Sequence, residues 1–234
     1  MGPISMKHYR ELLRHLKATM PVKNYLEIGI FRGETLLADP TPDVVVGVDP
    51  GFNIVTPFTG GKQVHFFRMP SDEFFEKRCW SRLGVGPVDL SFVDGMHWCE
   101  FALRDVLNSE RVSAPDSVIV VHDIYPSNEA EAARDINHGR WMGDVFKIIP
   151  ILDKYRPDMR SIVINDLYPS GVAIYTNLAP AEPIAHDTYR AMVNEMESLS
   201  FKSDFQTTVA SRSVSIQSQE AQDFLASLNY AIPP

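Results

Sequence analysis

Hydrophobic residues in the first half of the chain fall into short continuous runs, which polar or glycine-containing segments separate. The clearest runs are Tyr25 to Ile28, "DVVVGVD" (43–49), "VDLSFVDG" (88–95) and "SVIVVHD" (117–123), and "QVHFFRM" (63–69) is a weaker one. Short apolar runs bounded by turn residues are typical of buried strands. The sequence therefore predicts five strands before residue 124.

Between and after these runs the apolar residues recur every three or four positions, as on one face of a helix. This spacing predicts helices over residues 4–20, 98–112, 144–155, 189–199 and 220–230. Shorter helices are predicted to begin after Gly33 and near Ser71, where serine and acids favour a helix start. Because strands and helices alternate, we expect an α/β fold with a parallel sheet between helices.

The second half of the chain contains one strand pair of a different kind. "SIVIND" (161–166) and "GVAIYTNL" (171–178) are separated only by "LYPS" (167–170). So short a connection permits only an antiparallel hairpin, since a parallel crossover needs a dozen or more residues. We expect the polar segment 200–219 to be a loop or an edge ribbon. The whole chain, 1–234, is predicted to be one domain, with an N-terminal helix (1–22), a core (23–180) and a C-terminal extension (181–234).

Composition narrows the possible functions. The chain of 234 residues has a formal charge of −8, and it has no basic run of the kind that binds nucleic acid. Cys79 and Cys99 are too few for a disulfide framework and lack the spacing of a zinc site, so we expect a reducing compartment, the cytoplasm. No apolar run approaches the roughly 20 residues that span a bilayer, so no membrane association is predicted.

Acidic residues lie in or directly after four of the predicted parallel strands. These residues are Glu27, Asp49, Asp94 and Asp123. The carboxyl ends of parallel strands meet at one edge of a sheet, where ligands bind. Asp49 follows the glycine turn by about twenty residues, the place where an acid binds ribose hydroxyls. The turn from Gly29 to Gly33 lacks the G-x-G-x-x-G pattern that binds a pyrophosphate, so an adenosine ligand without one fits better.

These motifs resemble a known family. The segment "EIGIFRG" (27–33) is similar to the first motif of class I S-adenosylmethionine-dependent methyltransferases, and "VVGVD" (45–49) is similar to their second. "VDLSFVDGMHWCEFALRDV" (88–106), followed by "DSVIVVHD" (116–123), resembles the branch of O-methyltransferases that act on small molecules such as sugars and natural products. The resemblance covers roughly Asn24 to Asp123. One position departs from it, because the commoner first motif has a glycine where this chain has Phe31.

The resemblance implies a Rossmann-like fold with a mostly parallel, seven-stranded sheet whose last strand is antiparallel. It also implies that S-adenosylmethionine is the cofactor. Gly29 and Gly33 would approach its methionine part, and Glu27 would shape the turn or bind through water. Asp49 would bind the ribose, while Ser71 and Asp72 would lie near the adenine. Asp94, at the next strand end, completes the predicted cofactor site.

Methyl transfer to a hydroxyl is helped by a base or by a metal ion that lowers the pKa of the hydroxyl. We predict His97 as the general base, with Asp94 as the alternative. Asp94, His122 and Asp123 are the predicted ligands of Mg²⁺ or another divalent cation. In the family branch, acids correspond to Asp94 and Asp123, and often to His122 as well. The competing interpretation is structural: His122 ends a strand and His97 bonds a helix start.

The acceptor site is less constrained by the sequence. Trp98, Trp141 and Met142 are candidates to line it, although such residues are more often core. Segment 137–147 is a candidate lid in which His138 and Arg140 would contact the acceptor, or else a solvated loop. The main hypothesis is an enzyme that methylates a hydroxyl of a small molecule. An inert nucleoside-binding module and a dinucleotide-dependent oxidoreductase are the alternatives, and a homo-oligomer is left open.

Overall fold

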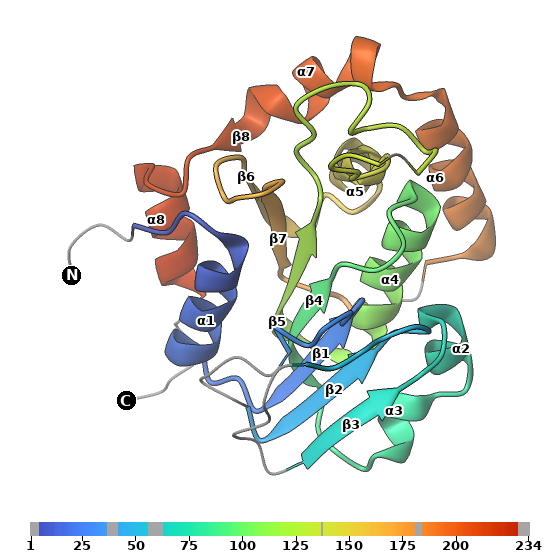
Figure 1. Cartoon of the computed structure of the whole chain (residues 1–234), viewed down its shortest axis with the longest axis vertical. Helices are drawn as coiled ribbons and strands as arrows, with labels where there is room; N and C mark the ends of the chain where they lie inside the picture. The colour runs from blue at the N-terminus through green and yellow to red at the C-terminus, as the bar shows by residue number, and fades with distance from the viewer. Residues whose placement is uncertain (1–4, 37–41, 56–62, 137, 181–183, 229–234) are drawn as a thin grey trace.

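The predicted strands join into one sheet in the computed structural model, which describes residues 5–36, 42–55, 63–136, 138–180 and 184–228 (Figure 1). The strand order is β3-β2-β1-β4-β5-β7-β6-β8. The strands are β1 (Asn24–Ile28), β2 (Val44–Val48), β3 (Gln63–Phe67), β4 (Val88–Val93), β5 (Ser113–His122), β6 (Arg160–Ile164), β7 (Val172–Thr176) and β8 (Ser213–Val214). All five runs in the first half of the chain are therefore strands, as predicted.

Strand β7 is the one that runs against its neighbours. It pairs antiparallel with both β5 and β6, whereas β1 to β5 pair in parallel. The predicted hairpin and the Rossmann-like fold with an antiparallel strand are thus confirmed. The sheet has one strand more than the seven predicted, because β8 adds to β6 in parallel. This short strand comes from the polar segment 200–219, which was expected to be a loop or an edge ribbon.

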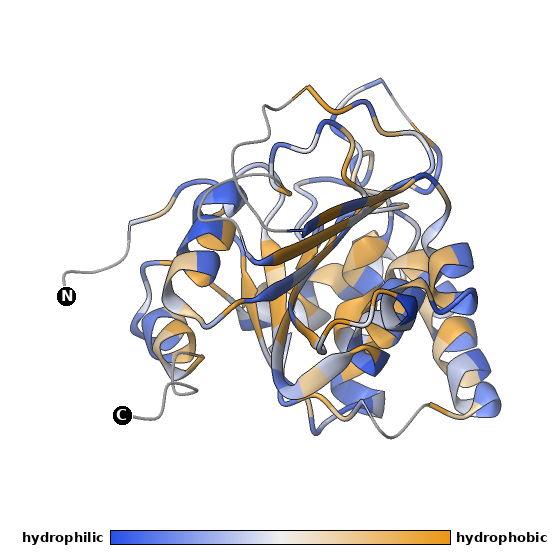
Figure 2. Ribbon diagram, turned by 90° about the horizontal axis from the view of Figure 1, so that it is seen from below, coloured by the Kyte–Doolittle hydropathy of each residue, from blue (hydrophilic) through white to orange (hydrophobic). Residues whose placement is uncertain are grey.

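Helices cover both faces of the sheet (Figure 2). Helices α1 (Tyr9–Thr19) and α8 (Gln219–Ser227) pack on one face. The other face carries α2 (Ser71–Glu76), α3 (Cys79–Arg82), α4 (Cys99–Arg111), α5 (Ile148–Tyr155) and α6 (His186–Ser198). A π-helical turn (Phe201–Phe205) and α7 (Gln206–Thr208) lead from α6 towards β8. None of the helices in the described ranges has the length and apolar character needed to cross a bilayer.

Two predicted helix starts differ from the structure. Residues 34–36 form a turn, and the rest of the helix predicted there falls on residues 37–41, outside the described ones. Ser71 is the first residue of α2 and not its cap, because Pro70 holds the cap position. The hydroxyl of Ser71 instead makes a hydrogen bond with the buried Asp105.

The register of the sheet brings the candidate site together. Ile28 of β1 lies opposite both Val48 of β2 and Val93 of β4, and Val93 lies opposite Val121 of β5. The residues that follow these strands therefore share one edge. Val172 of β7 pairs with His122, so the β6–β7 turn reaches the same edge from the other half of the chain.

Candidate functional site

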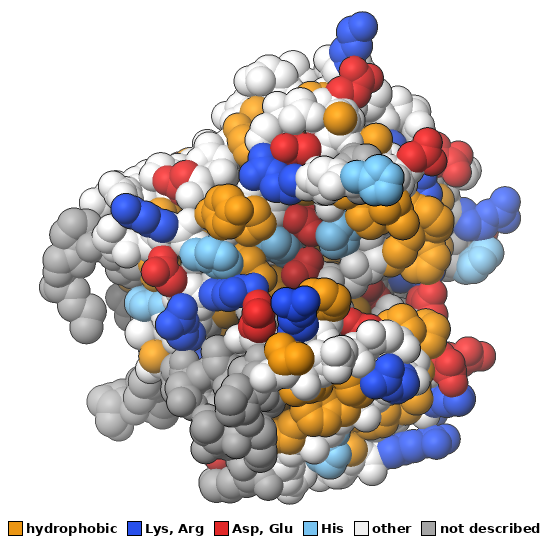
Figure 3. All heavy atoms as spheres, viewed as in Figure 1, with side chains coloured by type: hydrophobic (Ala, Val, Ile, Leu, Met, Phe, Trp, Pro, Cys, Tyr) orange, Lys and Arg blue, Asp and Glu red, His pale blue; other side chains and the backbone are white. Residues whose placement is uncertain are grey.

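A cavity of about 730 Å³ opens at this edge of the sheet. Gly29, Asp49, Ser71 and Asp72 line one end of it, and the other end is lined by Asp94, His97, His122, Asp123, Arg140 and Trp141. Histidine and acidic side chains gather at the centre of the corresponding molecular face (Figure 3). The volume is within the range of small-molecule sites. The cavity thus brings together most of the residues predicted for cofactor and chemistry.

The turn after β1 forms one wall of the cavity. Gly29 has φ +85°, and a Cβ there would lie 1.9 Å from the carbonyl oxygen of Asp94, so only glycine fits. Phe31 has φ +43°, a left-handed conformation that glycine adopts without strain. Phe31 therefore takes a glycine-like backbone conformation at the position where the commoner motif has glycine. Phe31 is 66% exposed and lines the cavity.

Asp49 connects this turn to the end of β2. One carboxylate oxygen, Oδ2, accepts a hydrogen bond from the Phe31 N–H at 3.0 Å, and Oδ1 accepts one from Gly51 N–H at 2.7 Å. Because each carboxylate oxygen has two lone pairs, Asp49 keeps acceptor capacity for the hydroxyls of a ligand. Backbone N–H groups after β1 and after β2 thus orient the carboxylate.

The remaining predicted cofactor residues have different environments. Asp72 forms a bidentate pair with Arg104, with N–O distances of 2.9 and 2.7 Å, and still lines the cavity beside Ser71. Gly33 belongs to the turn, where it has φ +73°. Glu27 is fully buried behind the turn and accepts hydrogen bonds from the hydroxyls of Tyr25 and Thr35. The position of Glu27 suits the predicted role of shaping the turn.

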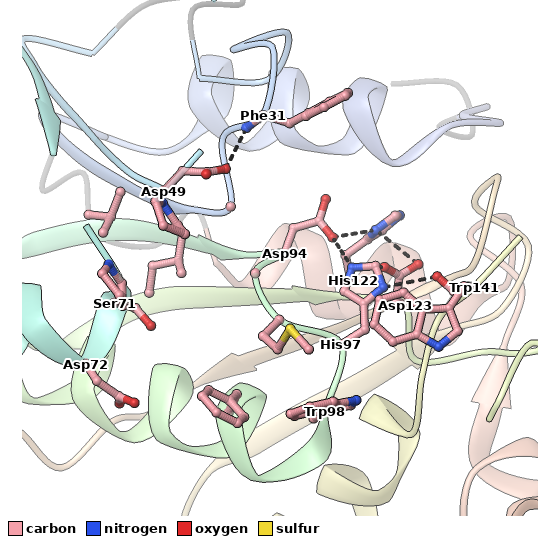
Figure 4. A pocket seen from close by; sticks show the side chains of 18 of the residues that line it. Phe31, Asp49, Ser71, Asp72, Asp94, His97, Trp98, His122, Asp123 and Trp141 are labelled. Atoms are coloured by element: carbon pink, nitrogen blue, oxygen red, sulfur yellow. Dashed lines mark hydrogen bonds and ion pairs between the residues drawn. The ribbon is translucent and has the colours of Figure 1, made fainter. Parts of the chain in front are cut away.

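At the other end, Asp94, His97, His122 and Asp123 point towards one another (Figure 4). His97 Nε2 lies 2.9 Å from Asp123 Oδ2 and 3.6 Å from Asp94 Oδ1. His122 Nδ1 lies 3.2 Å from Asp94 Oδ1 and 3.4 Å from Asp123 Oδ1. Two carboxylates and two imidazoles thus form one contiguous cluster, which we call the acid–histidine cluster.

His122 and Asp123 both join this cluster although they are neighbours in sequence. Strand β5 ends at His122, and Asp123 has φ +59°, so its side chain does not alternate to the opposite face. Both side chains can therefore face the same site. Ser170, from the β6–β7 turn, donates a hydrogen bond to Asp123 Oδ1 at 2.5 Å. The antiparallel hairpin therefore supports the cluster from behind.

The hydrogen bonds of the two histidines fix their protonation. His97 donates from Nδ1 to the carbonyl oxygen of Trp141 at 3.0 Å, while its Nε2 faces Asp123. Burial lowers the pKa of His97, but the hydrogen bonds with Asp123 and Asp94 outweigh it and raise the pKa to about 10. His122 donates from Nε2 to Ser170 Oγ at 3.1 Å, and both acids likewise raise its pKa to about 10 against the effect of burial.

Burial alone would raise the pKa of Asp123, but the two histidines hold it well below the usual range. At neutral pH both histidines are therefore charged, and neither has a ring nitrogen ready to accept a proton. This charge state disfavours His97 as a general base in the metal-free site.

The cluster has the donor set of a divalent-metal site. Ligating atoms of Asp94, His97 and Asp123 all lie within 4.8 Å of one another. Oxygen and imidazole ligands together suit transition metals, and carboxylates suit Mg²⁺. The predicted set contained His122 in place of His97, and the structure places His122 in contact with both acids as well. A second group, Cys99, Glu100 and Asp144, is already bound by Arg134 and Lys147.

The segment around Arg140 covers the cluster. Trp141 stacks on the His97 ring with centroids 5.0 Å apart, and Arg140 bonds Glu131 and the carbonyl oxygen of Pro169. Trp98 also lines the cavity, whereas Met142 is fully buried. Sequence reasoning missed Pro169 and Ser170, because only the pairing of β7 with β5 shows that their turn returns to the site.

Comparison with known proteins gives a family match for part of the chain. A family model described as a methyltransferase domain matches residues 26–124. This segment runs from β1 to the residue after Asp123 and carries the acids at the ends of β1, β2, β4 and β5. The match agrees, over these residues, with the methyltransferase motifs found in the sequence, while no curated protein matches the chain.

Solved structures share the fold of this chain. Cofactor-bound Rv0187 from MTB is 17% identical, with a TM-score of 0.54 over 76% of this chain and 81% of that one. The O-methyltransferase TomG from Streptomyces achromogenes, involved in tomaymycin synthesis and solved with SAM, is 18% identical, with a TM-score of 0.52 over 73% and 80%. An O-methyltransferase from Bacillus cereus, solved with SAH, is 13% identical, with a TM-score of 0.51 over 75% and 84%.

Proposed function

We propose that this methyltransferase transfers the methyl group of S-adenosylmethionine to a hydroxyl of a small molecule, with a divalent cation held by Asp94, His97 and Asp123. One observation carries the proposal: the acid–histidine cluster lies in the same cavity as Asp49 and the Gly29 turn. Neighbours of the same fold, TomG and the Bacillus cereus enzyme, are named as O-methyltransferases, which supports the choice of an oxygen acceptor.

We assign cofactor binding to one end of the cavity and the acceptor to the other. Asp49 would receive the ribose hydroxyls, Ser71 and Asp72 would border the adenine, and Gly29 would let the backbone approach the methionine part. S-adenosylmethionine, when bound, supplies the methyl group, and a divalent cation would lower the pKa of the acceptor hydroxyl. Trp141 and Pro169 exclude water at the acceptor end. A sugar or natural product is the acceptor class that the motif resemblance favours.

In this proposal His97 is a ligand and not the base. Its Nδ1 donates to the Trp141 carbonyl, which leaves Nε2 directed at the two acids. A metal ion can replace the Nε2 proton between these same groups, because imidazole ligates through a neutral nitrogen. Asp94 remains the alternative base if no metal takes part.

The test combines binding and turnover. Calorimetry with Mn²⁺ in the presence of S-adenosylhomocysteine should show one site in the wild type, and Asp94→Asn or Asp123→Asn should remove it. Asp116→Asn, an exposed acid of the same strand as His122, is the matched control and should keep it. A mass-spectrometric screen of hydroxyl compounds should detect methylation that EDTA abolishes and Mn²⁺ restores.

Two results would contradict the proposal in different ways. Full methylation in excess chelator would exclude the metal and leave Asp94 as the base. Tighter binding of NAD than of S-adenosylhomocysteine would exclude the cofactor itself and favour the oxidoreductase alternative.

A further inference from the structure

A buried lysine of helix α1 reaches the back of the turn that lines the cavity. Lys17 is 6% exposed and lies on the face of α1 that packs against the sheet. Its Nζ donates to the carbonyl oxygen of Thr35 at 2.8 Å and lies 4.0 Å from the centroid of the Tyr25 ring. Lys17 precedes the segment 26–124, so it is outside the matched methyltransferase domain.

Strand alternation turns Glu27 towards the same helix. Leu26 and Ile28 pack with the helices of the opposite face, so Tyr25 and Glu27 face α1. Glu27 accepts hydrogen bonds from Tyr25 Oη at 2.6 Å and from Thr35 Oγ1 at 2.5 Å. Burial raises the pKa of Glu27 to about 7, and the charge of Lys17 opposes this rise. Lys17 and Glu27 therefore hold Thr35 from two sides, one through its carbonyl and one through its hydroxyl.

The same turn is held on its cavity side by Asp49, through the Phe31 N–H. The turn is thus held at Phe31 by Asp49 and at Thr35 by Lys17 and Glu27. A buried ammonium is costly unless it is paired, and buried pairs often add little to stability compared with apolar residues of similar size. A role in placing the turn explains the pair better than a role in stability alone.

We propose that Lys17 is a positioning residue for cofactor binding: together with Glu27 it sets the turn so that Gly29 and Asp49 meet S-adenosylmethionine. The inference rests on the proposed function. Lys17 does not line the cavity, so its effect would act through the turn.

The experiment is calorimetric titration with S-adenosylhomocysteine, which needs no knowledge of the acceptor. Lys17→Met keeps the length of the side chain and removes its charge, and it should weaken binding about tenfold. Thr35→Val removes the hydroxyl bond to Glu27 and should weaken binding to a smaller extent. Arg14→Met is the matched control, since Arg14 lies on the exposed face of the same helix, and its affinity should equal that of the wild type.

A second measurement separates positioning from packing. The double variant Lys17→Met with Glu27→Gln removes both charges and should bind no tighter than Lys17→Met, even where its thermal midpoint recovers. Wild-type affinity in folded Lys17→Met and Thr35→Val, with only the thermal midpoint lowered, would overturn the inference. If Lys17→Met does not fold, Thr35→Val decides by the same criterion. Failure of the wild type itself to bind S-adenosylhomocysteine would overturn the proposed function and this inference together.

Discussion

Asp105 is a buried acid of helix α4, and few hydrogen bonds stabilise its charged form. It is 2% exposed, and its Oδ1 has no hydrogen-bond partner within the described part of the chain. Burial is the main reason that its pKa rises to about 7, and the hydrogen bond from Ser71 only partly opposes the rise. Because Ser71 borders the cavity, this acid lies directly behind the predicted adenine end.

We expect Asp105→Asn to stabilise the protein at pH 8. The amide keeps the size of the carboxyl and an oxygen for the Ser71 hydroxyl, and it removes the cost of a buried charge. The gain in free energy of unfolding should be about 4 kcal/mol at pH 8 and below about 1 kcal/mol at pH 4. Urea unfolding at both pH values measures it, with the exposed Asp116→Asn as control. An equal effect at both pH values would show that packing, and not ionisation, governs this site.

At the scale of elements, the segment that follows β5 must return over α4 to cover the acid–histidine cluster. Gly143 makes this possible: it has φ +60°, and a Cβ there would lie 1.7 Å from the carbonyl oxygen of His97. Two residues earlier, Trp141 stacks on the His97 ring and accepts its Nδ1 hydrogen bond. The position of the cover and the orientation of His97 therefore depend on each other.

We expect Gly143→Ala to displace this cover and to lower methyl transfer at least tenfold. Affinity for S-adenosylhomocysteine should stay near that of the wild type, because Asp49 and the β1 turn are unaffected. Gly84→Ala is the matched control: Gly84 also has a positive φ, +67°, but no atom lies within 4 Å of its added Cβ. Equal turnover in the two alanine variants would show that backbone strain alone, and not the approach to His97, accounts for any loss.

The sequence predicted those elements whose burial pattern is local. Strands such as Val44–Val48 are buried on both faces, so they appear in the sequence as continuous apolar runs. The acids that follow the parallel strands share an edge because the carboxyl ends of neighbouring parallel strands lie side by side. Strand β8 has two residues, too few to show a period. Ser170 reaches the site through the long-range pairing of β7 with β5, which no local pattern encodes. Trp141 was a candidate for the acceptor site, but its stacking on His97 was not predictable from the sequence. The buried contact of Lys17 with Thr35 is likewise not visible in the sequence.

At the scale of the whole molecule, the shifted pKa values predict how stability depends on pH. Glu27 and Asp105 have folded pKa values near 7, above the usual 4.5 and 3.8, so the folded state holds more protons between those limits. Their contribution is present below about pH 4 and is lost as the pH rises through 7. His97 and His122, raised from 6.5 to about 10, contribute below 6.5 and lose this contribution as the pH rises through 10.

Acids with lowered pKa values act in the opposite direction. Hydrogen bonds from Arg134 lower the pKa of Glu100 to about 2, so its contribution is present above about 4.5 and is lost as the pH falls through 2. We therefore expect the free energy of unfolding to be largest near pH 5 and to decline towards pH 8. Urea unfolding at pH 5, 6.5 and 8 tests this, and stability that rises from pH 5 to pH 8 would contradict it.

The cavity is lined by two stretches of chain that can change independently in evolution. The proposed nucleoside end is lined by residues between 28 and 72, inside the segment that matches the methyltransferase domain, while Arg140, Trp141 and Pro169 at the other end come from after residue 124. Substitutions in the later stretch can reshape the acceptor end without disturbing Gly29 or Asp49. The later stretch is therefore the part of the chain in which new acceptor preferences can evolve, and the part to randomise in a library that seeks them.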